Sequence, residues 1–267
     1  MPARIECVSS VGVYTRDQKR ARAFYTQKVG LRVRDATPKL GYLALGATKG
    51  GEDASLDVWQ PDPAWGPMYE ATVKQIGTVT GIGFLSANLA RTVEGLRRKG
   101  VEVEVTKEAD GEDFARIKDP DGNVFFASGD PKAAVKRPGL SRLEFITVVT
   151  RDADRAKDFF TKALGLKARK SGGFETFRVS PKGTSIMPFT PTREMYEDAS
   201  DYDADMAHVG EDTSIMFETS DVSALQEQLM GRGVRFSQKA KREEWGIHAK
   251  ILDPDDNVYS LVEMDGA

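Results

Sequence analysis

The amino-acid sequence predicts an α+β protein made of four βαβββ units that form two tandem modules. A segment near the start of each half is closely repeated, and a short turn motif follows it at a similar distance in both halves. Around these marks, each half shows a strand, a helix and further strands twice over. The chain of 267 residues is long enough for two domains of ordinary size.

The repeat is the strongest of these observations. Gly12–Arg34 and Thr147–Arg169 share 11 identities in 23 positions without a gap, always between residue i and residue i+135. The segment IKDPDGNVFF, Ile117–Phe126, recurs as ILDPDDNVYS, Ile251–Ser260. We therefore predict one module at 1–130 and a second at 140–267, with the joint at 130–139.

The first unit shows how the local signals predict its elements. Alternating apolar residues from Val11 predict a strand, and Asp17 stands where a helix N-cap would. Gly30 is placed to end that helix in the left-handed conformation. Strands are then expected at Tyr42–Leu45 and Ser55–Trp59.

The remaining units follow the same rhythm. The second unit is expected to contain a strand at Gly81–Asn88, a helix through Leu96, and strands at Val101–Val105, Glu112–Lys118 and Val124–Ala127. The DPDGN sequence predicts a tight turn between the last two strands, because Pro restricts φ and Gly supplies φ > 0. Module two repeats this with Met216–Asp221, a helix to Met230, and a turn at Asp253–Asn257.

Composition excludes several classes of function. The 38 Lys and Arg against 41 Asp and Glu give a net charge of -3, which is no basic footprint for nucleic acid. No apolar run approaches the ~18 residues of a membrane span, and no signal peptide is expected. A single cysteine suits a reducing compartment, so we expect a cytoplasmic protein.

Taken together, the Asp-capped helix ending in FY or FF, the Gly-Leu that follows and the DPDGN turn resemble the vicinal oxygen chelate superfamily. This superfamily includes glyoxalase I, bleomycin-resistance proteins, fosfomycin-resistance enzymes and extradiol dioxygenases. The resemblance implies glyoxalase-like modules, in which two βαβββ units form one curved mixed sheet with the helices on its convex side. It also implies metal ligands on the concave face.

The metal-ligand positions implied by the resemblance hold almost no ligands in this sequence. In module one they fall on Ser10, Asp57, Gly81 and Phe126, and in module two on Phe145, Met187, Ser214 and Ser260. Only Asp57 could coordinate a metal, and one carboxylate does not hold Zn²⁺, Fe²⁺ or Mn²⁺. We therefore expect no metal and no cofactor.

The side chains that share the concave face with these positions are the candidate ligand-binding residues. In module one they are Tyr14, Asp57, Trp59, Gly81, Gly83, Phe114, Arg116 and Phe126. In module two they are Met187, Phe189, His248 and Lys250. The two glycines are expected to leave space, the aromatic rings to form walls, and Asp57 and Arg116 to supply opposite charges. Trp65 could cover the cup formed by the concave face of module one, or pack against it.

The leading hypothesis is a metal-independent protein of the bleomycin-resistance type that binds a small aromatic or amphipathic molecule. One alternative is a metal-free lyase or isomerase with Asp57 as base and Arg116 stabilising negative charge. Others are a divalent-metal glyoxalase or dioxygenase, should the strand register differ, and a non-catalytic scaffold with filled cups. Neither nucleic acid nor membrane is an expected partner. The assembly is expected to be a monomer containing an intramolecular pseudo-dimer, or a homodimer.

Overall fold

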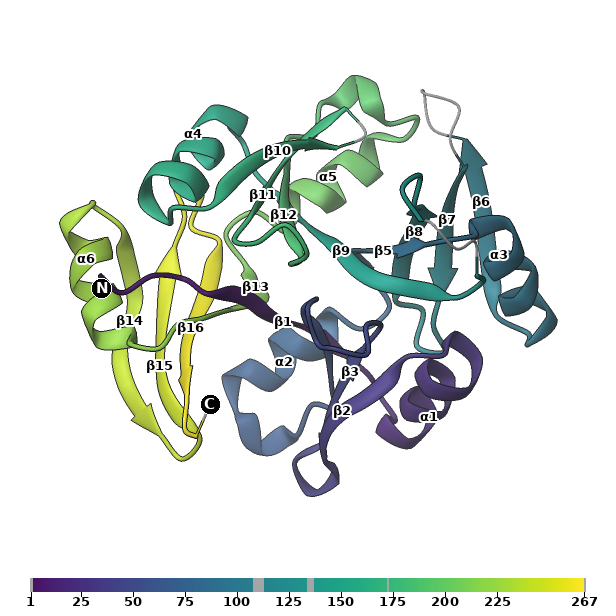
Figure 1. The fold of residues 1–267 in the computed structure, drawn as a ribbon, viewed down its shortest axis with the longest axis horizontal. Coiled ribbons are helices and arrows are strands. Elements are labelled where there is room, and N and C mark those ends of the chain that lie inside the picture. The colour runs from purple at the N-terminus through teal and green to yellow at the C-terminus, as the bar shows by residue number, and fades with distance from the viewer. Residues whose placement is uncertain (1, 108–112, 134–136, 172, 267) are drawn as a thin grey trace. The chain divides into compact units, whose positions relative to one another are not determined.

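A computed structural model describes residues 2–107, 113–133, 137–171 and 173–266 of the chain (Figure 1). These residues form two compact units. One is Val11–Phe145, and the other joins the residues up to Ser10 to those from Ile146 onward. The boundary passes through two strands, β1 (Cys7–Tyr14) and β9 (Leu140–Val149). Of the joint expected at 130–139, residues 134–136 lie outside the described part, as does the first residue of the strand expected at Glu112–Lys118.

Two βαβββ units follow one another from β1 to β8, as the sequence predicts. The elements after β1 are α1 (Gln18–Ala23), η1 (Phe24–Val29), β2 (Arg32–Thr37), η2 (Pro38–Leu40), β3 (Tyr42–Gly46), β4 (Ser55–Trp59), η3 (Pro63–Trp65), α2 (Pro67–Lys74), β5 (Val79–Ser86), α3 (Leu89–Arg98), β6 (Glu102–Lys107), β7 (Asp113–Lys118) and β8 (Val124–Gly129).

The other unit repeats this order. The elements after β9 are α4 (Ala153–Asp158), η4 (Phe159–Ala163), β10 (Lys167–Ser171), β11 (Phe174–Arg178), β12 (Ser185–Phe189), η5 (Arg193–Met195), α5 (Ala199–Ala207), β13 (Asp212–Glu218), α6 (Val222–Gly231), β14 (Arg235–Glu243), β15 (Gly246–Leu252) and β16 (Val258–Met264). Among the described residues, no helix has the length and apolar character needed to span a bilayer.

The strands form two eight-stranded mixed sheets, which confirms the predicted fold class. Their orders are β14-β15-β16-β13-β1-β4-β3-β2 and β10-β11-β12-β9-β5-β8-β7-β6. The pairing of the βαβββ units into sheets differs from the expected one. Within Val11–Phe145, β1–β4 and β5–β8 belong to different sheets, and β5 pairs with β9. Residues of one sequence module are therefore divided between two sheets.

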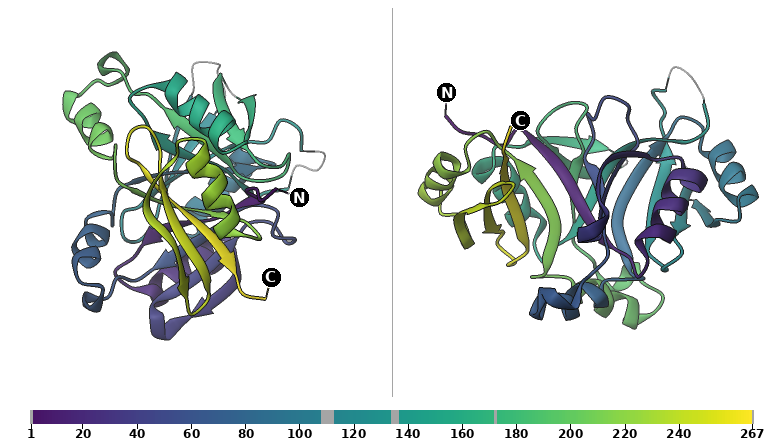
Figure 2. Two further views of the ribbon diagram at one scale, coloured as in Figure 1. Left: turned by 90° about the vertical axis from the view of Figure 1, so that its left-hand side faces the viewer. Right: turned by 90° about the horizontal axis from the view of Figure 1, so that it is seen from below.

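Each sheet buries one face against helices, as period-2 alternation requires. On β8, Phe125 and Ala127 are buried, whereas the neighbouring Phe126 is half-buried on the opposite face. The helix α3 contributes Val93 and Leu96 to the same core. In the other unit, α6 packs on β14–β16, and Figures 1 and 2 show it on one side of these strands.

The first helix of module one begins and ends as the sequence predicts. The Asp17 carboxylate accepts a hydrogen bond from the backbone N–H of Arg20 at 2.9 Å, and Gly30 has a φ of 91°. Between them the helix widens into the π-helical turn η1. In this wider turn the consecutive residues Phe24 and Tyr25 are both buried, at 5% and 2% exposure.

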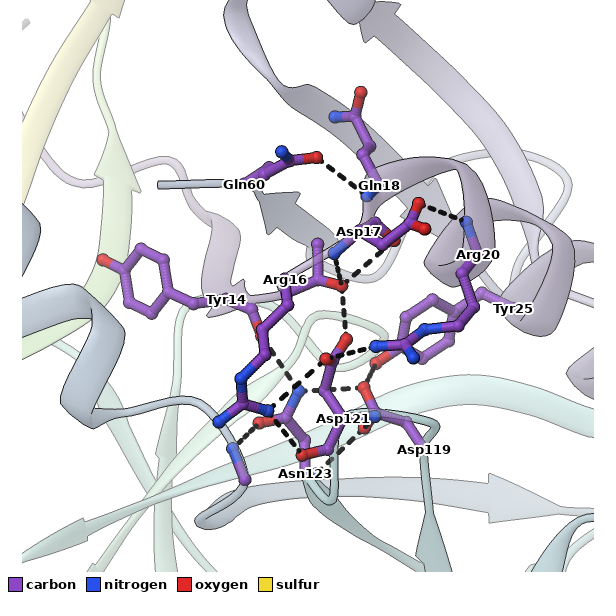
Figure 3. Close-up of polar contacts among 12 residues, drawn as sticks. Tyr14, Arg16, Asp17, Gln18, Arg20, Tyr25, Gln60, Asp119, Asp121 and Asn123 are labelled. Atoms are coloured by element: carbon purple, nitrogen blue, oxygen red, sulfur yellow. Dashed lines mark hydrogen bonds and ion pairs between the residues drawn. The ribbon is translucent and has the colours of Figure 1, made fainter. Parts of the chain in front are cut away.

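The DPDGN turn locks the end of β1 to the start of α1 (Figure 3). The Thr15 hydroxyl and the Arg20 guanidinium both donate to the Asp121 carboxylate, at 2.5 and 2.6 Å. The Tyr25 phenol donates to Asp119 at 2.6 Å. Asn123 donates to Asp119 at 2.8 Å and to the Tyr14 carbonyl at 3.0 Å. The repeated residues Thr15, Asp17 and Arg20 therefore stabilise the fold.

The second module rebuilds the same network around Asp253, Asp255 and Asn257. Thr150 donates to Asp255 at 2.5 Å, and Asn257 donates to the Val149 carbonyl at 3.1 Å. The phenol that reaches Asp253, at 3.0 Å, comes from Tyr259 on β16. The repetition of these motifs thus has a structural cause in both copies.

Candidate functional site

Asp57 lies in the middle of β4 and is 4% exposed. The Ser55 hydroxyl donates to its carboxylate at 2.6 Å. The Tyr42 phenol also hydrogen-bonds Asp57, and burial together with this negative charge raises the pKa of Tyr42. The residue opposite Asp57 on β3 is Ala44, whose small side chain leaves the carboxylate space. Asp57 is therefore a buried acid, and the hydroxyl groups of Ser55 and Tyr42 help to hold it in position.

Aromatic residues lie near this acid on the neighbouring strand and at the end of β4. The rings of Tyr42 and Trp59 lie 4.5 Å apart between centroids, at an interplanar angle of 39°. The rings of Trp65 and Trp59 lie edge to face with centroids 6.0 Å apart, and Trp65 belongs to η3 in the Pro-rich loop. Trp65 therefore packs against Trp59. We call Tyr42, Asp57, Trp59 and Trp65 the acid–aromatic cluster.

Sequence reasoning missed Tyr42 as a member of this cluster. The strand Tyr42–Leu45 was predicted, but its register against β4 was not. The observed pairing places Tyr42 opposite Trp59 and Ala44 opposite Asp57. Alternation along β3, read together with that along β4, is the signal that could have shown it. Tyr14 ends β1 beside β4, since the N–H of Thr15 donates to the Trp59 carbonyl at 2.9 Å.

A second group of candidate residues lies on β5, β7 and β8. The rings of Phe114 and Phe126 stack with centroids 5.2 Å apart and an interplanar angle of 27°. The Arg116 guanidinium lies over the Phe126 ring at 5.8 Å and is 4.0 Å from the Glu104 carboxylate. The sequence-based assignment of Phe114, Arg116 and Phe126 to one face is confirmed by the strand register.

Neither glycine of β5 has the role expected from the sequence. A Cβ added to Gly83 would overlap the ring of Phe145, so this position seats an aromatic side chain from β9 instead of leaving space. Gly81 has a φ of 68° at a register shift in the pairing of β5 with β8. It serves a β-bulge, which needs the left-handed backbone.

The expected single site of module one is not assembled. Asp57 and Trp59 lie on β4, whereas Phe114, Arg116 and Phe126 lie on β7 and β8 of the other sheet. The expectation failed because β1 and β5, the first strands of the two units, do not pair with each other. Asp57 and Arg116 consequently do not share a face as base and charge stabiliser.

The candidate residues of module two are divided in the same way. Met187 and Phe189 are half-buried on β12, whereas His248 and Lys250 lie on β15 of the other sheet. The His248 Nε2 atom is 3.0 Å from the Ser260 hydroxyl, and its pKa is lowered, first by burial and then by Lys250. Lys250 donates to Asp212 at 2.7 Å. Both His248 and Lys250 therefore have partners within the protein.

Comparison with known proteins agrees with this architecture. The family model of the Glyoxalase/Bleomycin resistance protein/Dioxygenase superfamily matches residues 8–125 and 142–261. The chain belongs to this superfamily. The uncharacterized protein YetH of Bacillus subtilis (strain 168) is 27% identical over 128 residues, which cover 46% of this chain and 99% of YetH.

Two solved structures resemble the whole chain. Glyoxalase I from Zea mays superposes with a TM-score of 0.65 at 16% identity, over 96% of this chain and 92% of its own. A putative dioxygenase from Bacillus subtilis subsp. subtilis str. 168 gives a TM-score of 0.64 at 13% identity, over 97% and 85%. At these identities the likeness establishes the superfamily fold.

The residues at the implied metal positions do not fit a divalent metal. Of the eight side chains, only Asp57 is a carboxylate, and its oxygens already receive hydrogen bonds from Ser55 and Tyr42. Within the described ranges, no three His, Cys, Asp or Glu side chains lie close enough together to hold one ion. The donor set of this superfamily member thus differs from the one that its fold implies.

Proposed function

We propose that the protein binds a small planar organic cation at the acid–aromatic cluster, without a metal ion. The observation that carries this proposal is the buried Asp57 carboxylate, which Ser55 and Tyr42 hold beside the rings of Tyr42 and Trp59. The superfamily fold hosts both binding proteins and enzymes, so the side chains have to decide between them.

The chemistry of the cluster favours a cation over a neutral or anionic ligand. A carboxylate away from bulk water exerts a stronger field than an exposed one. The faces of Trp and Tyr rings attract positive charge through their quadrupoles, an effect worth about 2 kcal/mol when the cation is desolvated. A planar ligand could stack on Trp59 while Asp57 balances its charge. Binding of this kind requires no bond to be made or broken.

Fluorescence quenching tests the proposal on the full chain. We would replace Trp245 by Phe, so that emission comes from Trp59 and Trp65, and titrate the planar cation 1-methylquinolinium against its neutral counterpart 1-methylnaphthalene. The cation should bind at least tenfold more tightly, and EDTA should not alter its affinity. Asp57→Asn should remove the preference for the cation by about tenfold, which corresponds to ~1.4 kcal/mol.

Phe189→Leu is the matched control, since Phe189 ends β12 as Trp59 ends β4. It should leave the titration unchanged. Absence of quenching by any planar cation would contradict the proposal and favour the filled scaffold. Binding that disappears with EDTA would favour metal chemistry. The lyase or isomerase hypothesis loses support because Asp57 and Arg116 lie on different sheets.

A further inference from the structure

A cavity of about 510 Å³ that is largely open to solvent lies in the unit that contains Ile146–Met264, and none of the residues that line it belongs to the acid–aromatic cluster. Three segments line it: the helical segment α4–η4, the turn between α6 and β14, and the DPDDN turn after β15. Cavities of this size accommodate small molecules. Nothing in the proposed function makes use of it.

Four cationic side chains from these segments line the cavity: Arg155, Lys162, Arg232 and Arg235. All four belong to exposed residues. The lining acids are Asp158 and Asp253. Asp253 is 3% exposed, and its carboxylate is engaged by Asn257 and Tyr259. The surface that a ligand would meet is therefore positively charged.

Backbone carbonyls hold three of the guanidinium groups in place. Arg155 donates to the Pro254 carbonyl at 3.1 Å and Arg235 donates to the Asp253 carbonyl at 3.0 Å. Arg232 donates to the Ala163 carbonyl at 2.7 Å, and this hydrogen bond also caps the end of η4. A guanidinium has five N–H donors, so each group retains donors after this contact. Fixed guanidinium groups suit the oxygens of phosphate.

Two of these cations are not balanced by an acid. Lys162 pairs with Asp158 at 2.8 Å, and Arg235 pairs with Asp256 at 2.6 Å. For Arg155 and Arg232, the contacts within the described part of the chain are to carbonyls, without a carboxylate partner. A carbonyl dipole orients a guanidinium but does not neutralise its charge. The cavity therefore retains positive charge.

The equivalent positions of the first repeat show which of these cations has a counterpart paired with an acid. Arg20, the counterpart of Arg155 at i+135, pairs with the buried Asp121 at 2.6 Å. Glu102, which begins β6 as Arg235 begins β14, pairs with Lys118 at 3.2 Å. Lys99, which follows α3 as Arg232 follows α6, donates to the carbonyls of Gln27 and Lys28. Among the described residues of the first repeat, the counterpart of Arg155 is therefore balanced by an acid, whereas the counterpart of Arg232 contacts carbonyls, as Arg232 itself does.

We propose that this cavity is an anion site for a small molecule carrying more than one phosphate group, with Arg155 and Arg232 as its main contacts. The two guanidinium groups would grip separate phosphate oxygens, and Lys162 and Arg235 would add to the positive field. This site is independent of the function proposed for the acid–aromatic cluster.

Isothermal titration of the full-length protein with inorganic pyrophosphate tests the proposal. Pyrophosphate should bind, and the double variant Arg155→Gln/Arg232→Gln should weaken binding at least tenfold. Lys99→Gln removes a cation with the same capping role from the first repeat, and should leave the affinity within twofold. Asp158→Asn removes negative charge from the lining and frees Lys162, so it should tighten binding severalfold.

Three outcomes would overturn the proposal. They are no heat of binding at millimolar pyrophosphate, equal loss in Lys99→Gln and the double variant, and unchanged affinity in the double variant. Thermal melting of each variant reports whether it folds. Should the double variant not fold, Arg155→Gln alone and Asp158→Asn decide the question by their opposite effects.

Discussion

The phenol of Tyr25 donates to the carboxylate of Asp119, and both groups are buried. In the second repeat the matching carboxylate, Asp253, receives its hydrogen bond from Tyr259. The helix position of Tyr25 is occupied there by Phe160, and the strand position of Tyr259 is occupied in the first repeat by Phe125. In each repeat the two rings lie edge to face, 5.7 and 5.9 Å apart. In each repeat one tyrosine hydroxyl therefore donates to this carboxylate, from the helical segment in the first repeat and from the strand in the second.

Moving this hydroxyl should be tolerated, whereas deleting it should not. Tyr25→Phe leaves a buried carboxylate with one donor fewer, which should cost about 1–3 kcal/mol of unfolding free energy. The double variant Tyr25→Phe/Phe125→Tyr should recover most of this loss. Urea denaturation measures both. Equal stability of the single and double variants would contradict the exchange of donors.

Gly83→Ala should destabilise the protein, because the added Cβ overlaps the Phe145 ring. Overpacking of this kind costs about 1–3 kcal/mol. Gly95→Ala is the control, since Gly95 lies within α3 and a Cβ there meets nothing within 4 Å. It should stabilise the protein by about 0.5–1 kcal/mol. If Gly83→Ala melted like the wild type, Phe145 would not occupy this position.

The pH dependence of stability should contain a contribution from His248. Its pKa is lowered from the ordinary 6.5 by burial and by Lys250, so the unfolded chain binds the proton more strongly than the folded one. Stability should therefore fall as the pH drops below about 6.5, and His248→Gln should reduce this fall. The control is His208→Gln, at a half-buried histidine whose ring lies 3.0 Å from the Glu211 carboxylate. Urea denaturation between pH 5 and about 7.5 tests the window.

Cys7 should react slowly with alkylating reagents. Burial, and then the nearby Glu218, raise the pKa of its thiol to about 11, and the thiolate is the reactive form. At about pH 8, iodoacetamide should modify the folded protein more slowly than the urea-unfolded chain. Glu218→Gln should speed the reaction of the folded protein. Equal rates for folded and unfolded chains would refute this assignment.

Local structure could be predicted from the sequence, because its signals are local. Asp17 caps a helix, Gly30 ends one, and Ser55–Trp59 is a strand with the predicted bounds. The choice of partner for β5 could not be predicted in this way. Four similar βαβββ units offer similar first strands, and the hydrophobic pattern of a strand does not state which neighbour it pairs with. The error in grouping Asp57 with Arg116 follows from this ambiguity.

The passage of the unit boundary through β1 and β9 has a consequence for dissecting the protein. Leu140–Phe145 belongs to one compact unit, whereas Ile146–Val149 belongs to the other, although a single strand contains both. If the two repeats were expressed as separate proteins, one of them would lack a strand segment that belongs to its compact unit. Separately expressed halves would have to overlap in sequence, each carrying its own copy of these residues, before either could be expected to fold alone.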